Sequence, residues 1–208
     1  MNLQKRLLVI VDMQNDFIYG TLPAYGGEVL GEKIAKLASR WDGDILMTYD
    51  LHKDETYLNT QEGLKLPIKH CICGTDGATE IDQLSDIADN SNTFKFFKDA
   101  FVKNQLLVYL THVLHEKYLD EIIRDEDKDR YTKHLIPQVY DEIVLCGVCT
   151  DICVISNAIL FKSIDPELEV TVIGDLCAGT TKENHEAALN LMKNSLQIDV
   201  VQSGTYLY

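Results

Sequence analysis

The sequence predicts an α/β fold: a three-layer, doubly wound and mostly parallel sheet of about six strands with helices on both faces. Two observations predict it. Short, continuous apolar runs alternate along the chain with longer segments of helical period. The apolar runs lack polar alternation, which is typical of strands that are buried on both faces. No composition break and no linker rich in Pro, Gly or Ser divides the 208 residues, so we expect a single domain over residues 1–208.

The predicted elements follow one another in a regular order. The stronger strand candidates are residues 7–11, 45–49, 143–148 and 170–173, and the weaker ones are 93–97 and 198–202. The helical candidates are residues 28–39, 104–124, 152–163 and 182–194. The charged stretch 115–134 carries no chemical motif, so we expect a solvated helical excursion there. Sites in doubly wound sheets form where strands end, so the residues that follow each strand are the first candidates for function.

Composition excludes several classes of partner. The formal net charge of -14 and the pI near 4.7 would repel nucleic acid and anionic lipid, so we expect neither as a partner. The first apolar run, residues 7–11, is too short for a signal peptide, and no other run approaches the length of a membrane span. Six cysteines without a secretory signal are expected to be reduced, which indicates a cytoplasmic protein.

Cys153 is the strongest candidate nucleophile. It follows the apolar strand 143–148 at the start of a predicted helix, where Thr150 or Asp151 would act as the N-cap. Backbone N–H groups and the positive end of the helix dipole would lower the pKa of a thiol there below its usual value of about 8.5. The same N–H groups can bind an oxyanion, as acyl transfer requires. The alternative is a small, buried hydrophobic residue.

Asp12 and a lysine are candidates to assist this cysteine. Asp12 ends the first strand, where a half-buried carboxylate can serve as a general base or can simply bind turn amides. Lys95 lies in a mostly apolar strand end, where its charge could balance those of Asp12 and Cys153. It could also be a solvated lysine on an edge strand, and Lys98 is its rival for any role.

A second constellation has the donor types of a metal site. Asp50 and His52 form an Asp-x-His pair at the end of the second strand, His70 could join them, and Glu62 could add an oxygen. Such a set suits Zn²⁺, Mn²⁺ or Fe²⁺ with open coordination positions.

Other cysteines offer an alternative site. Cys71 with Cys73, or Cys149 with Cys153, could form a thiolate metal site or a redox pair, but neither pair has the C-x-x-C spacing typical of such sites.

Five motifs in this order closely resemble one family. They are VDMQNDF around Asp12, Asp50-x-His52, His70-Cys71 before Gly74-Thr75, Lys95 before Ala100-Phe101, and the run from Gly147 to Val154. Over roughly residues 7–180 the chain resembles the nicotinamidase branch of the isochorismatase-like cysteine hydrolases. The resemblance implies a catalytic triad of Asp12, Lys95 and Cys153. It also implies metal ligation by Asp50, His52 and His70, with Glu62 as a further ligand.

The resemblance also bears on finer features. The family lysine precedes its Ser-Ala-Phe phenylalanine by six residues, and Phe101 follows Lys95 at that spacing, although the serine is Asp99 here. A cis peptide bond is implied before Cys149. Some nicotinamidases stack an aromatic residue on the pyridine ring three positions before the last metal histidine, where this chain has a proline. Phe17 or Tyr25 is therefore expected to cover the ring.

The implied activity is metal-dependent hydrolysis of nicotinamide to nicotinic acid and ammonia through a thioester on Cys153. The N–H groups of Cys149 and Cys153 would form the oxyanion hole. Zinc is the expected metal, with manganese and iron as alternatives, and the chain is expected to be a homo-oligomer. Alternative hypotheses are a related hydrolase of another small amide or ureido compound, or a non-catalytic metal or thiol redox protein on the same scaffold.

Overall fold

A six-stranded sheet forms the centre of the structure, a computed structural model that describes residues 5–110, 112, 139–165 and 167–207. The strands are β1 (Arg6–Val11), β2 (Asp44–Asp50), β3 (Thr93–Lys98), β4 (Glu142–Val148), β5 (Glu169–Ala178) and β6 (Asp199–Val201). Their order is β3-β2-β1-β4-β5-β6, and every neighbouring pair is parallel. The predicted α/β fold is confirmed.

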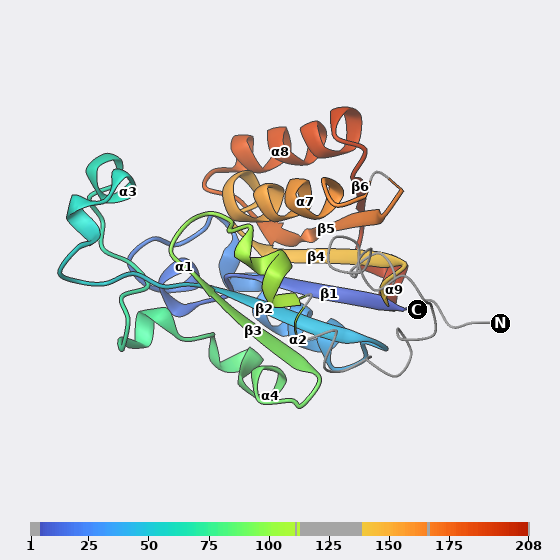
Figure 1. Cartoon of the computed structure of the whole chain (residues 1–208), viewed down its shortest axis with the longest axis horizontal. Coiled ribbons are helices and arrows are strands. Elements are labelled where there is room, and N and C mark those ends of the chain that lie inside the picture. Colours follow the sequence, from blue (N-terminus) through green and yellow to red (C-terminus); the bar gives the residue numbers. More distant parts are fainter. Residues whose placement is uncertain (1–4, 111, 113–138, 166, 208) are drawn as a thin grey trace.

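Helices cover the sheet and its ends (Figure 1). The α-helices are α1 (Asn15–Ile18), α2 (Gly31–Ala38), α3 (Gln61–Lys65), α4 (Ser85–Ala88), α7 (Ile155–Lys162), α8 (Lys182–Ser195) and α9 (Gly204–Leu207). Short 3₁₀ turns are η1 (Gly27–Val29), η2 (Tyr57–Asn59), η3 (Asp76–Ala78) and η4 (Asp82–Leu84), and η5 (Thr150–Val154) is a π-helical turn. Residues 105–110 are also helical.

The winding of the chain places the helices on opposite faces. From β1 the chain moves to β2 through α2, and from β4 it moves the other way, to β5, through α7. Right-handed crossovers in opposite directions put these two helices on opposite sides of the sheet. Figure 1 shows α7 and α8 together on one side. On α2 the buried Ile34, Leu37 and Ala38 recur at helical spacing, which explains the amphipathic pattern.

Most predicted elements are found with shifted ends. The helix predicted over residues 28–39 is the turn η1 followed by α2, and the one predicted over 152–163 is divided between η5 and α7. β5 is longer than the run 170–173, because a register irregularity between Leu145 and Gly147 lets pairing with β4 continue to Ala178. Most of the helix predicted over 104–124 lies outside the described residues, as does the charged stretch 115–134.

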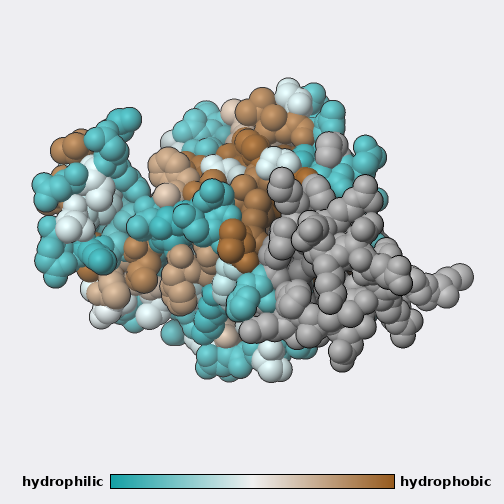
Figure 2. Space-filling view, in the orientation of Figure 1, coloured by the Kyte–Doolittle hydropathy of each residue, from teal (hydrophilic) through white to brown (hydrophobic). Residues whose placement is uncertain are grey.

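The strand order fixes where a site can form. β1 and β4 are neighbours at the centre, and the connections leaving them run to opposite edges, which creates a topological switch point at their carboxyl ends. The carboxyl ends of β2 and β3 reach the same edge. The segment that carries α3 projects from the body near this edge, with a largely hydrophilic surface (Figures 1 and 2).

Gly147 pairs with Val11 where β4 runs beside β1 at this edge. Its φ is +112°, and a Cβ there would lie 2.2 Å from the carbonyl oxygen of Val11. We expect Gly147→Ala to lower the free energy of unfolding by about 3 kcal/mol or more, measured by urea denaturation. Gly174→Ala in β5 is the control. Its Cβ would lie nearest to the side chains of Leu189 and Val200, at 3.2 and 3.4 Å, and not in close contact with backbone atoms. Equal losses of unfolding free energy in Gly147→Ala and Gly174→Ala would contradict this explanation.

Candidate active site

Three buried side chains meet at the switch point. The Lys98 ammonium lies 2.7 Å from Asp12 Oδ2 and 3.7 Å from Cys153 Sγ. Asp12 is fully buried, Lys98 is 3% exposed and Cys153 is 7% exposed. A carboxylate, an ammonium and a thiol that lie together in one buried site form the set needed for acid–base assisted attack by sulfur.

The ends of the strands position this group. Asp12 directly follows β1 with a φ of +49°, a left-handed conformation that is unusual for a residue other than glycine. Its N–H donates to the carbonyl of Thr48 at 3.1 Å, and the Thr48 hydroxyl donates to Asp12 Oδ1 at 2.7 Å. Lys98 is the last residue of β3 and lies opposite Asp50 in the register with β2. The strained backbone at Asp12 is thus held by the neighbouring strand.

The structure places Lys98, and not the expected Lys95, beside Asp12 and Cys153. Lys95 does not join Asp12 and Cys153; its side chain is 33% exposed and lies 3.5 Å from Asp89 and 3.9 Å from Glu80. Residues three apart in a strand point to opposite faces and lie about 10 Å apart along it, so only one of the two lysines can reach the site. The spacing to Phe101 was misleading because Lys98 is separated from Phe101 by only two residues.

The nucleophile turn also differs from expectation. Cys149 occupies the N-cap of η5 and makes no side-chain capping bond, so the prediction that Thr150 or Asp151 caps this helix is wrong. Thr150 instead pairs with His185, and Asp151 accepts from the N–H of Thr180 at 2.8 Å. The Val148–Cys149 peptide bond is cis, as the family resemblance implied.

Burial dominates the electrostatics of the three groups. It raises the pKa of the Cys153 thiol well above its usual value, although Lys98 opposes this, so the expected lowered pKa is wrong for the resting site. Burial also raises the pKa of Asp12, and the charge of Lys98 offsets part of the rise. For Lys98, burial acts against the charged form, but attraction by Asp12 and Cys153 outweighs it and raises the pKa. The Asp12–Lys98 pair at 2.7 Å thus lies beside a thiol whose ionisation is opposed by burial.

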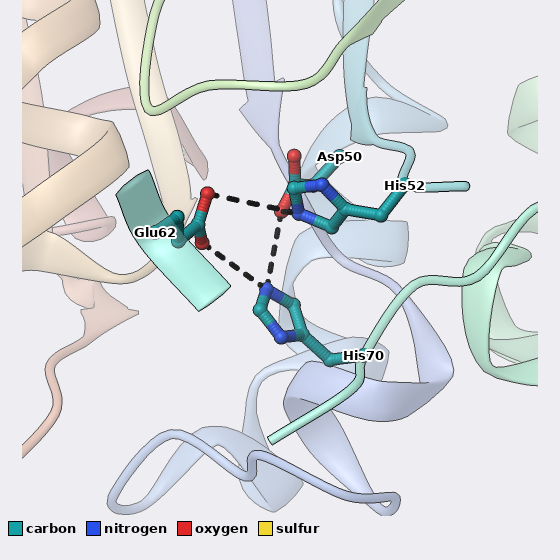
Figure 3. A group of neighbouring side chains, drawn as sticks. All are labelled: Asp50, His52, Glu62 and His70. Atoms are coloured by element: carbon teal, nitrogen blue, oxygen red, sulfur yellow. Dashed lines mark hydrogen bonds and ion pairs between the residues drawn. The ribbon is translucent and has the colours of Figure 1, made fainter. Parts of the chain in front are cut away.

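Four further side chains converge next to this ion pair (Figure 3). One donor atom from each of Asp50, His52, Glu62 and His70 lies within 4.8 Å of the others. Asp50 Oδ2 is 2.9 Å from Nε2 of His52 and 3.4 Å from Nε2 of His70. The Glu62 carboxylate approaches both rings, at 3.9 and 3.5 Å. The structure thus brings together all four residues that were predicted as metal ligands.

The donor set fits a divalent transition metal. Two imidazole nitrogens with carboxylate oxygens suit Zn²⁺, Mn²⁺ or Fe²⁺. Asp50 Oδ1 is buried without a hydrogen-bond partner in the described part of the chain, with Lys98 Nζ 3.9 Å away. Burial alone would lower the pKa of His70, but Asp50, Glu62 and the Ile68 carbonyl raise it to about 10. The nearby carboxylates therefore stabilise positive charge on His70, as expected of a cluster that favours a cation.

Outer contacts orient the donors. The Ile68 carbonyl lies 2.8 Å from Nδ1 of His70, an arrangement that leaves Nε2 directed at the cluster. Gln14 is fully buried; its amide donates to the Asp50 carbonyl at 2.8 Å and accepts from the Asp50 N–H at 2.7 Å. Asp16 accepts from the N–H of Cys71 at 2.7 Å and so fixes the chain next to His70.

Aromatic rings surround the histidines. The centroid of the Phe17 ring lies 5.4 Å from the centroid of the His70 ring. Tyr57 is 1% exposed and packs edge-on against both histidine rings, at 4.9 Å from His52 and 5.3 Å from His70. Tyr25 is 62% exposed, and its backbone N–H donates to the carbonyl of Gly179. Phe17 is therefore well placed to cover a bound ring, whereas Tyr25 is mostly in solvent.

A cavity of about 360 Å³ adjoins the site. It lies between α3 and the loop after β3, and its lining residues are Thr60, Gln61, Glu62, Lys65, Asp99, Ala100 and Phe101. Because Glu62 belongs to the donor cluster and Asp99 follows Lys98, the cavity borders both halves of the site. It offers space for a small molecule beside Glu62.

Sequence reasoning missed Gln14 and Tyr57. Gln14 lies within the VDMQNDF motif two residues after Asp12, and that position was the available signal. Tyr57 gives no local signal, because its contact with two histidines depends on how the segment before α3 folds back.

These features define an α/β fold with a buried cysteine nucleophile candidate beside a four-donor metal group. The chain belongs to the isochorismatase family: residues 6–203 match the isochorismatase domain. It is 29% identical to the nicotinamidase/pyrazinamidase of Mycobacterium tuberculosis over 195 residues, 91% of this chain and 95% of that one. It is 28% identical to the nicotinamidase of Saccharomyces cerevisiae over 183 residues, 74% of this chain and 80% of that one.

Solved structures share the fold. The Pyrococcus horikoshii pyrazinamidase in complex with zinc has a TM-score of 0.69 at 23% identity, covering 95% of this chain and 99% of that one. PnC1 from L. infantum in complex with nicotinate has a TM-score of 0.70 at 21% identity, covering 97% and 94%. Within the described residues, no helix has the length and apolar character needed to cross a membrane.

Proposed function

We propose that this protein is a metal-dependent nicotinamidase, which hydrolyses nicotinamide to nicotinic acid and ammonia. The observation that carries the proposal is the juxtaposition of Asp12, Lys98 and Cys153 with the four-donor cluster. Family membership and the two curated relatives named as nicotinamidases support it. The catalytic triad is Asp12, Lys98 and Cys153, with Lys98 replacing Lys95.

Asp50, His52, Glu62 and His70 hold the metal, and we propose zinc because two histidines with carboxylates are a frequent zinc set. A metal held there would supply a Lewis acid for the pyridine nitrogen, which would orient the carboxamide. Phe17 covers the ring on the side of His70, and Tyr25 remains a candidate for the outer side of the pocket.

The residues of the triad then carry the chemistry. Asp12 removes the proton from Cys153 Sγ as the sulfur attacks the carboxamide carbon, and the N–H groups of Cys149 and Cys153 bind the oxyanion. Lys98 keeps Asp12 ionised and stabilises the developing charge at sulfur.

The second half of the reaction uses the same groups. Asp12 returns its proton to the departing nitrogen, ammonia leaves, and a thioester remains on Cys153. Asp12 then takes a proton from water as the water attacks the thioester carbonyl. Nicotinic acid is released and the thiol is restored.

The remaining parts of this proposal are expectations from the sequence. We retain one domain over residues 1–208, a homo-oligomeric state and a cytoplasmic location as proposals. The small molecule nicotinamide is the proposed partner, and the strongly acidic composition supports the absence of nucleic acid.

The direct test is ammonia release from nicotinamide by purified, zinc-loaded protein, with nicotinic acid identified by chromatography. Saturable formation of both products in equal amounts supports the proposal. A folded, metal-loaded protein that releases neither product refutes it, and a panel of other small carboxamides and ureido compounds then identifies the substrate.

We expect turnover to depend on the metal. A chelator should remove it and abolish turnover, and stoichiometric Zn²⁺ should restore turnover. His52→Ala should weaken metal binding by about 100-fold or more, because it removes one of two imidazole donors. Elemental analysis after dialysis measures the metal. Cys153→Ala is the matched control and should retain the metal; full activity of wild-type protein without bound metal would contradict this prediction.

A further inference from the structure

A polar network outside the triad and the metal group ties η5 to the beginning of α8. Thr150, the first residue of η5, is fully buried, and its hydroxyl oxygen lies 2.8 Å from Nδ1 of His185 on α8. Burial lowers the pKa of His185 despite the nearby Asp151 and Glu186. The imidazole is therefore neutral at pH 7, and Nδ1 can accept the hydrogen bond from Thr150.

The next residue of the turn reaches the same region. Asp151 accepts from the backbone N–H of Thr180 at 2.8 Å and from its hydroxyl at 2.5 Å. Asn184 donates to that hydroxyl at 2.9 Å. A Cβ at Gly179 would lie 2.8 Å from Asp151 Oδ1 and 2.9 Å from Cβ of His185. Consecutive residues of η5 are therefore clamped against the start of α8, with no space for a side chain between them.

Thr150 and Asp151 lie in the chain between Cys149 and Cys153, whose N–H groups are the proposed oxyanion donors. Thr150 follows Cys149 directly and precedes Cys153 by three residues, so its hydroxyl anchors the backbone that carries both proposed oxyanion donors. Asn157 holds the far side of the same turn, since its amide donates to the Cys153 carbonyl at 2.8 Å. Oxyanion donors are effective only when they are fixed before the reaction, and a displacement of about 1 Å can cost roughly 100-fold in rate.

We propose that His185 is a positioning residue: it acts through Thr150 to hold the nucleophile turn so that the N–H groups of Cys149 and Cys153 face the developing oxyanion. His185 itself does not touch the substrate in this proposal. The inference rests on the proposed function for the reaction that it serves, but the contact between η5 and α8 does not depend on the identity of the amide.

Two pairs of variants test it. Thr150→Val and His185→Leu remove the hydrogen bond, and each should lower kcat by about 10- to 100-fold with KM changed less than about 3-fold. Thr150→Ser keeps the hydroxyl, and the side-chain amide of His185→Asn can occupy the place of Nδ1, so both should retain kcat within about 3-fold. The double variant Thr150→Val/His185→Leu should be no slower than the slower single variant, because both changes break one contact.

A second measurement separates this inference from the proposed function. Hydrogen exchange of the backbone amides in residues 149–153 should be faster in His185→Leu than in wild-type protein and unchanged in Leu191→Ala, a control on the exposed face of α8. The inference would be overturned if the losses of kcat in the two single variants multiplied in the double variant. An effect on KM alone, or unchanged hydrogen exchange in residues 149–153 of His185→Leu, would also overturn it. If wild-type protein does not hydrolyse nicotinamide, the proposed function fails, and the exchange measurement still decides whether His185 holds the turn.

Discussion

Cys153→Ala is expected to lower ammonia release by about 10⁴-fold or more, because it removes the sulfur that forms the proposed acyl intermediate. The variant should fold and keep its metal, since the thiol is not among the clustered donors. Ammonia release and elemental analysis on one preparation measure both effects. Acid-quenched wild-type protein should also carry a nicotinoyl group on the peptide that contains Cys153.

A matched control is available in the same strand and turn region. Cys146→Ala removes another buried thiol, in β4, and should cost some stability while it leaves turnover within about 3-fold. Cys153→Ser tests sulfur itself: the hydroxyl is similar in size but a much weaker nucleophile, so little activity should remain. A Cys153→Ala protein that still hydrolysed nicotinamide at the wild-type rate would exclude the thioester mechanism.

The sequence predicted site residues best where a residue stands at or after the end of a buried strand. Asp12, Asp50 and Cys153 each follow or end a buried apolar run, and parallel strands bring such positions to one edge. Glu62 lies in the short helix α3 and His70 in a loop, so their donor types marked them as candidates but no strand end fixed their positions. Gln14 and Tyr57 were missed because no local pattern specifies their contacts: Gln14 binds the backbone of Asp50, and Tyr57 packs against the rings of His52 and His70.

Two errors have physical causes that the sequence does not express. The pKa of Cys153 depends on the balance between burial and a cation, and burial is a property of the whole packed site. The choice between Lys95 and Lys98 depends on where β3 ends relative to β2. Both lysines lie in an apolar context, but pairing of Lys98 with Asp50 puts the last residue of the strand, and not an earlier one, at the site.

Lys98→Met is expected to lower kcat/KM by about 10³-fold or more and also to destabilise the protein. It leaves Asp12 as a fully buried carboxylate without its partner at 2.7 Å, and breaking one side of a buried pair costs about 3–5 kcal/mol. The unpaired Asp12 would then be protonated and could not act as a base. Turnover and urea denaturation measure the two effects separately.

A double substitution separates catalysis from stability. Asp12→Asn/Lys98→Met removes both charges, so much of the lost stability should return while activity stays absent. Lys95→Met is the positional control: its partially exposed ion pairs contribute at most about 1 kcal/mol, and turnover should remain within about 3-fold. If Lys95→Met abolished turnover and Lys98→Met did not, the lysine expected from the family spacing would be the catalytic one. The strand register that places Lys98 beside Cys153 would then not be the register of the active enzyme.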